Sequence, residues 1–177
     1  MQLIKQTDTR FKRKIIKLYK SAFPKEERKP LRLIKKLVKQ GKADVFAVLD
    51  DKGRFSGEVI TVVGKDTVLI DYLAISEKCR RLGYGSKVLS FIREIYGGKT
   101  VILEIEDPSE PSDNAPERIK RKSFYLKNGF CVLDFKVDLF GCKMLVLSSN
   151  DKISFKDYYS LQKTVYPFFA IKKIKKI

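Results

Sequence analysis

The spacing of apolar residues changes between residues 41 and 44 of this chain, and that change restricts the folds the chain can adopt. Between residues 8 and 41 apolar side chains return every three or four positions, which predicts two helices. The first is expected near residues 8–22 with a cap at Thr7 or Asp8, and the second from Pro30 to Gly41. From residue 44 the period becomes two, which predicts three antiparallel strands joined by tight turns, at 44–49, 55–63 and 67–75.

The second half of the chain alternates helices with strands. A helix from about residue 83 to 96 precedes a strand at 100–105, and a helix that stops at Gly129 precedes strands at 130–137 and 142–148. The expected order is ααβββαβαββ, a mixed α/β fold. Its sheet should be twisted, and antiparallel except where the strand at 67–75 meets the strand at 100–105 across a right-handed helical crossover.

The size and composition of the chain fit one compact domain. Its 177 residues are 44% hydrophobic, enough for a substantial core. No uninterrupted apolar run approaches the ~18 residues of a membrane span, and the opening residues MQLIKQTDTR lack the apolar core of a signal peptide. We expect a cytoplasmic protein with no membrane partner. Residues 1–148 should form the main domain, and residues 149–177 a C-terminal helical extension packed on it or on a dimer partner.

The chain contains no histidine, which excludes several kinds of active site. Ser-His-Asp and Cys-His nucleophiles and histidine-containing zinc sites all require an imidazole. Any catalytic acid or base must then be a carboxylate, Tyr, Lys or Cys. The three cysteines lack metal-ligand spacing, so we expect no metal and interpret them as reduced packing thiols: Cys79, Cys131 and Cys142.

The formal net charge is +17, and two explanations of it stay open. A basic surface can bind a polyanion such as RNA. However, 28 of the 38 basic residues are lysines spread over the expected helix faces. Lysine-rich solvated faces are more common than nucleic-acid grooves, in which arginine and stacking aromatic residues alternate.

Two short motifs carry the most specific information about function. Residues 80–85, Arg-Arg-Leu-Gly-Tyr-Gly, follow an apolar strand and open a helix, and residues 124–130, Phe-Tyr-Leu-Lys-Asn-Gly-Phe, end a later helix. Alone, the first is typical of a glycine-rich turn and the second of an aromatic helix end with a glycine stop. Their order and their separation along the chain argue against coincidence.

Together with the element order, these motifs resemble the GNAT family of N-acetyltransferases over about residues 1–148. Residues 22–30, 103–108 and 121–130 also resemble a bacterial branch of that family whose substrate is not characterised. The resemblance implies the acyl-CoA N-acyltransferase fold. It also implies transfer of an acetyl group from acetyl-CoA to a primary amine, by direct attack in a ternary complex. The alternative is a catalytically degenerate module of the same fold that binds RNA or another polyanion.

The resemblance also assigns the cofactor side of the site. Backbone N–H groups of the glycine loop and the helix start would hold the pyrophosphate of coenzyme A, aided by the helix dipole. The preceding strand would pair with the pantetheine chain through Leu73, Ala74 and Ile75, with the Leu73 N–H as oxyanion donor. Tyr125 would protonate the departing thiolate. The expected cofactor loop consists of Arg80, Arg81, Leu82, Gly83, Tyr84, Gly85 and Ser86.

The sequence leaves the general base open. On the strand at 100–105 and the residue after it, the period of two puts Glu104 and Glu106 on one face. Ionised carboxylates on a covered strand favour a site for the substrate amine, with Glu104 as the first catalytic candidate. A strand end that emerges into solvent is the competing explanation, and it suits Glu106 better. Asp71, on the same strand face as Leu73, is a third candidate for the amine site, and water is a fourth base.

Two positions depart from the family pattern. Leu69 stands where many members have a glutamate base, and Arg118 stands where many have a cofactor-binding asparagine. We expect Arg118 and Arg121 either to reach the phosphates of the cofactor or to form a basic helix face. The sequence does not choose between a small-molecule and a peptide amine, or between a monomer and a homodimer.

Overall fold

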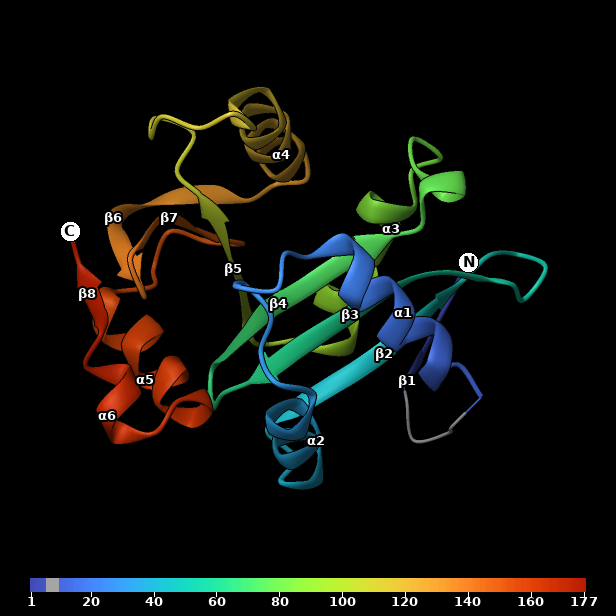
Figure 1. Ribbon diagram of the computed structural model, residues 1–177, viewed down its shortest axis with the longest axis horizontal. Coiled ribbons are helices and arrows are strands. Elements are labelled where there is room, and N and C mark those ends of the chain that lie inside the picture. The colour runs from blue at the N-terminus through green and yellow to red at the C-terminus, as the bar shows by residue number, and fades with distance from the viewer. Residues whose placement is uncertain (6–9) are drawn as a thin grey trace. The chain divides into compact units, whose positions relative to one another are not determined.

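The computed structural model describes residues 1–5 and 10–177 (Figure 1). This part of the chain forms two compact units, Met1–Val63 with Ile70–Gly97, and Gly64–Leu69 with Gly98–Ile177. Its strands form a sheet in the order β1-β2-β3-β4-β5-β7-β6-β8, and β4 (Thr67–Ile75) contributes residues to both units. The expected order ααβββαβαββ is confirmed, with one short strand added at each end.

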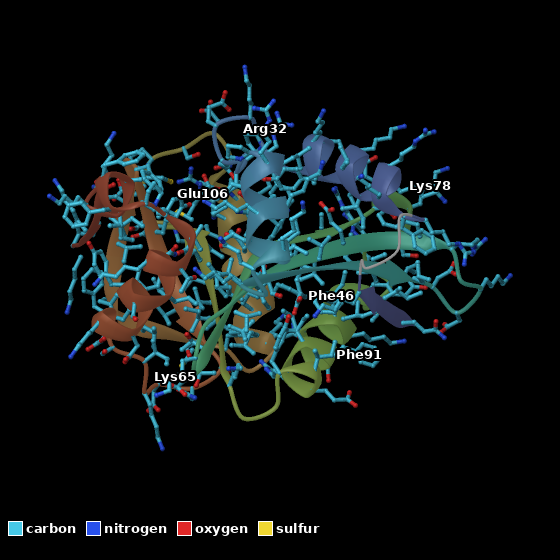
Figure 2. All side chains as sticks on the ribbon, turned by 90° about the horizontal axis from the view of Figure 1, so that it is seen from below. Arg32, Phe46, Lys65, Lys78, Phe91 and Glu106 are labelled. Carbon is cyan, nitrogen blue, oxygen red and sulfur yellow. The ribbon has the colours of Figure 1, made fainter. Side chains whose placement is uncertain are left out.

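In the first unit, helices lie on both faces of the strands. Ala47 of β2 packs in a cluster with Phe11 and Ile15, whereas its neighbour Phe46 meets Tyr96, which directly follows α3, with ring centroids 6.5 Å apart. Figure 2 shows α1 and α2 on one side of these strands and α3, with Phe91, on the other. The elements of this unit, besides most of β4, are β1 (Gln2–Lys5), α1 (Lys12–Ala22), α2 (Leu31–Lys39), β2 (Ala43–Leu49), β3 (Phe55–Val63) and α3 (Tyr84–Ile95).

The boundaries of the first two helices follow from backbone chemistry. Pro30 directly precedes α2, where a fixed φ and a missing N–H cost nothing. Gly41 ends the helical segment with a φ of 67°, a left-handed conformation that glycine adopts without steric cost. Helix α1 begins at Lys12, later than expected, and the expected cap at Thr7 or Asp8 lies outside the described residues.

The segment between α1 and α2 is fastened to β4 by tyrosine hydroxyls. Tyr72 donates to the carbonyl of Glu27 and accepts from the N–H of Lys29, both at 2.8 Å. Tyr19 of α1 donates to the carbonyl of Lys29 at 3.0 Å. The two tyrosine rings meet edge to face at 4.8 Å within a buried cluster that includes Ile34. These contacts fix the path of residues 23–30 over the strand.

In the second unit, the C-terminal segment packs on the strands of the same unit. Helix α5 opens with a capping box between Ser154 and Asp157. Its Phe155 and Tyr158 rings lie 5.7 and 6.0 Å from the ring of Phe135 in β6. The elements of this unit, besides the start of β4, are β5 (Thr100–Glu106), α4 (Ala115–Lys127), β6 (Cys131–Leu139), β7 (Cys142–Ser148), α5 (Phe155–Val165), α6 (Phe168–Ile171) and β8 (Ile174–Lys176) (Figure 1).

The two added strands are short and lie at the edges of the sheet. Strand β1 pairs antiparallel with β2, and β8 pairs antiparallel with β6. Four and three residues are too few to produce a readable period of two, so neither strand was expected. No helix in the described part of the chain combines the length and the apolar character needed to cross a membrane.

Gly57 of β3 marks a close approach of two backbones. A Cβ atom at this position would lie 2.5 Å from the carbonyl oxygen of Ala74 and 3.3 Å from the Cα of Ile75. Both contacts are with backbone, which cannot move aside as a flexible side chain can. The absence of a side chain at Gly57 is therefore a condition for the pairing of β3 with the end of β4.

Replacing Gly57 with alanine should destabilise the protein. The added methyl group forces β3 and β4 apart, and we expect Gly57→Ala to lower the free energy of unfolding by about 2 kcal/mol or more, measured by urea denaturation. Gly97→Ala is the matched control, because a Cβ atom at this position would lie 3.5 Å from the carbonyl oxygen of Glu94, an ordinary contact. Equal stability of the two variants would contradict this account of Gly57.

Candidate active site

The predicted cofactor loop forms an uncapped helix start. Gly83 is the N-cap of α3 with a φ of 77°, and Arg81 also has a positive φ, 65°. The first turn of α3 contains no acidic residue, and the N-cap Gly83 has no side chain that could cap the helix. The N–H groups of a first helical turn have no intrahelical acceptors, so this end offers backbone donors and the positive end of a helix dipole. That arrangement suits a phosphate.

The loop and the end of β4 lie together in the first unit. The Nε of Arg80 donates to the carbonyl of Ile75 at 3.3 Å, which ties the loop to the last residue of the strand. Ala74 is buried, and Leu73 and Ile75 are half-buried. The structure thus brings the expected pantetheine strand and pyrophosphate loop into contact with each other.

Asp71 of β4 is held in a buried ion pair. The Nζ of Lys29 lies 2.6 Å from its carboxylate, with 9% and 4% of the Lys29 and Asp71 side chains exposed. Lys29 belongs to the segment between α1 and α2 that Tyr72 and Tyr19 fasten. Asp71, the third candidate that the sequence offered for the amine site, is therefore already paired with an ammonium group of the protein itself.

Glu104 of β5 receives two hydrogen bonds from α5. The Tyr158 hydroxyl and the Nε2 of Gln162 both donate to its Oε1 at 2.5 Å. Burial and the negative charge of Glu104 raise the pKa of Tyr158, so the hydroxyl keeps its proton and remains a donor. The C-terminal segment, whose role the sequence did not indicate, thus supplies the partners of the first catalytic candidate.

Glu106 is paired with the two arginines that the sequence left undecided. The Nη2 of Arg118 lies 2.5 Å from one carboxylate oxygen, and the Nη1 of Arg121 lies 3.2 Å from the other. These pairs hold α4 on the end of β5. The next residue, Asp107, is buried, which by itself would raise its pKa. Hydrogen bonds from Lys136 and Ser109 outweigh this effect and lower the pKa to about 2.

Tyr125 lies near the end of α4 with its ring between two others. The ring centroids of Phe124 and Phe130 are 5.1 and 5.9 Å away, both in edge-to-face geometry. Burial raises the pKa of Tyr125 to about 12, against an opposing effect of Arg121. No hydrogen bond to its hydroxyl is found among residues 1–5 and 10–177. The hydroxyl is therefore protonated near neutral pH and not committed to a local acceptor.

Glu58 of β3 is a buried acid that the sequence analysis did not single out. Its side chain is 0% exposed, and neither carboxyl oxygen has a hydrogen-bond partner within the described chain. Burial raises its pKa from the ordinary 4.5 to about 8, so the carboxyl is mostly protonated at neutral pH. The signal was present in FSGEVITVV, where one glutamate interrupts an otherwise apolar strand. No group of three or more His, Cys, Asp or Glu side chains in the described residues could hold a metal ion.

Comparisons with known proteins identify the fold. Neither a family model nor a curated protein sequence matches the chain. Among solved structures, a protein assigned to the GNAT acetyltransferase family, from Bacteroides thetaiotaomicron, is similar with a TM-score of 0.75 and 19% identity over 96% of this chain and 98% of that one. The chain has the fold of the GNAT acetyltransferases.

Two further structures with this fold carry functional descriptions of their own. An aminoglycoside 6′-N-acetyltransferase complexed with coenzyme A has a TM-score of 0.63 and 13% identity, covering 84% of this chain and 95% of that one. A spermidine N-acetyltransferase chimera, derived in part from Vibrio cholerae, has a TM-score of 0.64 and 14% identity, over 84% and 94%. At these identities the likeness establishes the GNAT fold of the present chain, and the glycine loop on α3 lies within that fold.

The raised pKa of Glu58 should make stability depend on pH. The native state holds this proton up to pH of about 8, whereas the unfolded chain releases it near the ordinary 4.5. Unfolding between these values releases a proton, so wild-type stability falls as pH rises through this window and levels off above it. Glu58→Gln cannot ionise and should gain about 2–4 kcal/mol relative to wild type between pH 5 and 8, measured by urea denaturation.

A matched control is Glu94→Gln, which removes a carboxyl from an exposed position of α3. The stability difference between this variant and wild type should change little from pH 5 to 8. A Glu58→Gln difference that is equally independent of pH would mean that Glu58 is ionised in the native protein, contrary to its buried and unpaired environment.

Proposed function

We propose that the protein is an acetyl-CoA-dependent N-acetyltransferase that transfers the acetyl group to a primary amine by direct attack in a ternary complex. The observation that carries the proposal is the uncapped start of α3 behind Arg80–Gly85, tied to the end of β4 within a GNAT fold. Acetyl-CoA supplies the acetyl group as a thioester. Its pyrophosphate fits the backbone N–H groups of residues 83–86, with Arg80 and Arg81 beside them.

The half-buried end of β4 is the proposed pantetheine site. Leu73, Ala74 and Ile75 would pair with the pantetheine chain through their backbone, and the Leu73 N–H would stabilise the oxyanion that forms on the acetyl carbonyl. The pyrophosphate and the pantetheine chain of the cofactor would then both be bound, which fixes the position of the thioester while the amine approaches. The amine nitrogen then bonds to the acetyl carbon as the C–S bond breaks.

Tyr125 is the proposed acid for the departing thiolate. Its pKa of about 12 keeps the proton on the hydroxyl at neutral pH, and that hydroxyl has no acceptor among the described side chains. The acceptor is a primary amine of a small molecule or a peptide, and the two similar structures named for spermidine and aminoglycosides favour a small cationic amine. Asp71, Glu104 and Glu106 are the proposed acidic residues around that amine.

A second candidate function is a module that binds RNA or another polyanion. The C-terminal segment supports it, because Phe168 and Phe169 are 74% and 76% exposed and are followed by four lysines within residues 172–176. Exposed aromatic rings beside lysines can stack on bases and neutralise phosphates. Such a module would gain nothing from acetyl-CoA.

A thermal-shift comparison separates the two functions. Acetyl-CoA should raise the melting temperature of wild type, because a ligand of the native state stabilises it. In Gly85→Val, a branched side chain stands where the backbone must meet phosphate, so we expect about tenfold weaker affinity or complete loss, measured by calorimetry. The control Ser90→Val places a valine at an exposed position further along α3, and this variant should bind acetyl-CoA with wild-type affinity. Stabilisation by heparin with none by acetyl-CoA would favour the polyanion module.

Removing the Tyr125 hydroxyl should slow turnover without weakening cofactor binding. Tyr125→Phe keeps the ring that packs on Phe124 and Phe130, and we expect turnover to fall by about 10²–10⁴-fold, as for a removed general acid. Steady-state kinetics and acetyl-CoA calorimetry check this, with Tyr159→Phe of α5 as the control. Unchanged turnover in a folded Tyr125→Phe would make Tyr125 a packing residue and leave water as the proton source.

A further inference from the structure

The position of Glu58 follows from the register of β3 and β4. These strands are neighbours, and the Ser76 N–H donates to the Ser56 carbonyl at 2.9 Å. The Gly57 position lies against Ile75, so the antiparallel register places Glu58 opposite Ala74. Directly opposite residues have Cβ atoms about 5 Å apart. The Glu58 side chain therefore starts beside the strand segment proposed to bind pantetheine.

The surroundings of Glu58 are polar but already committed to one another. Glu58 acts electrostatically on Tyr19 of α1, whose other charged or titratable neighbours are Lys29 from the segment that follows the helix and Asp71 and Tyr72 from β4. Lys29 is paired with Asp71, and both tyrosine hydroxyls bind the backbone of that segment. From β2 the cross-strand neighbour is Ala47, which offers no charge.

A buried carboxyl without any partner is unusual in a folded protein. Its desolvation costs free energy that a single hydrogen bond would recover, and most buried polar side chains make at least one. The buried, unpaired carboxyl of Glu58 therefore indicates a site at which a hydrogen-bond partner is missing. The missing partner must be a hydrogen-bond donor or a cation, and the primary amine of the proposed acceptor is a group of that kind.

We propose that Glu58 is the general base of the acetyl transfer and takes its proton from the attacking amine, directly or through one water molecule. This rests on the proposed N-acetyltransferase function. The amine lone pair forms the C–N bond, the C–S bond breaks, and the N–H proton moves to the ionised Glu58 carboxylate. The thiolate receives its own proton from Tyr125, so charge and protons balance. Glu58 is fully covered in the described structure, so the side chains that cover it must move for the amine to reach it.

The acidic candidates that the sequence offered are less suited to accept this proton. Two donors from α5 already bind one carboxylate oxygen of Glu104, and Arg118 and Arg121 occupy both oxygens of Glu106. Asp71 is bound to Lys29. Glu58 keeps both oxygens unoccupied, and burial gives it a proton affinity close to neutral pH, where a general base works best.

The kinetic experiment compares Glu58→Gln, Glu104→Gln and the exposed control Glu94→Gln in the full-length protein. The acceptor is the best substrate from a panel of spermidine, kanamycin and a short peptide. Glu58→Gln should bind acetyl-CoA with unchanged affinity and lose about 10²–10⁴-fold in kcat, as expected for a removed general base. Wild-type kcat/KM should rise with pH with a midpoint near pH 8 and level off above it, and this limb should be absent in Glu58→Gln.

A second readout does not depend on turnover. Carbon-13 NMR titration of glutamate carboxyls, with Glu58→Gln to assign the signal, should give Glu58 a pKa near 8 that falls when spermidine and coenzyme A are added together. Near-normal kcat in Glu58→Gln, or loss of the pH limb in Glu104→Gln alone, would overturn the role of Glu58 and leave the acetyltransferase function standing. Failure of the wild type to bind acetyl-CoA would remove both.

Discussion

A carboxylate taken out of water needs hydrogen-bond donors or must keep its proton, and this constraint governs the polar interior of the protein. Within the second unit, Asp107 meets it with Lys136 and Ser109, and Glu106 with two arginines. In the first unit, Asp71 meets it with Lys29. The two arginines belong to α4 and Lys29 to the segment before α2, so these pairings also fix α4 and that segment against strands, whereas Lys136 of β6 binds the residue that follows β5.

The same constraint explains what the C-terminal segment contributes to the second unit. Glu104 stands on β5 with apolar neighbours, and its donors come from two positions one turn apart on α5, Tyr158 and Gln162. Without α5 the carboxylate would lose both donors, and the rings of Phe155 and Tyr158 would leave Phe135. The segment therefore stabilises β5 through polar and apolar contacts together. It also determines how much of Glu104 remains available to a substrate.

The sequence predicted the elements better than their polar partners. The order of helices and strands follows from apolar spacing, which is local, and the helix boundaries at Pro30 and Gly41 follow from proline and glycine chemistry. By contrast, Lys29 is 42 residues from Asp71, and Gln162 is 58 residues from Glu104. Such pairs depend on the packed fold. The proposed cofactor loop could be nominated as a whole because it is one contiguous segment, whereas the acidic candidates could be nominated but not told apart.

Glu58 shows why a chain without histidine would retain an unpaired acid. The ordinary pKa of a carboxyl group is too low for it to take a proton effectively near neutral pH, and those of tyrosine and lysine are too high. A chain lacking imidazole can obtain a group that titrates near neutrality by burying a carboxyl without a hydrogen-bond partner, and Glu58 is in that environment. Leu69, at the position where many GNAT family members have a glutamate, is then compatible with the proposed catalysis, because the proposed proton acceptor stands on β3 instead of β4. The buried carboxyl of Glu58 makes the native protein less stable at alkaline pH. Such a loss of stability is common where a site is preorganised for a ligand.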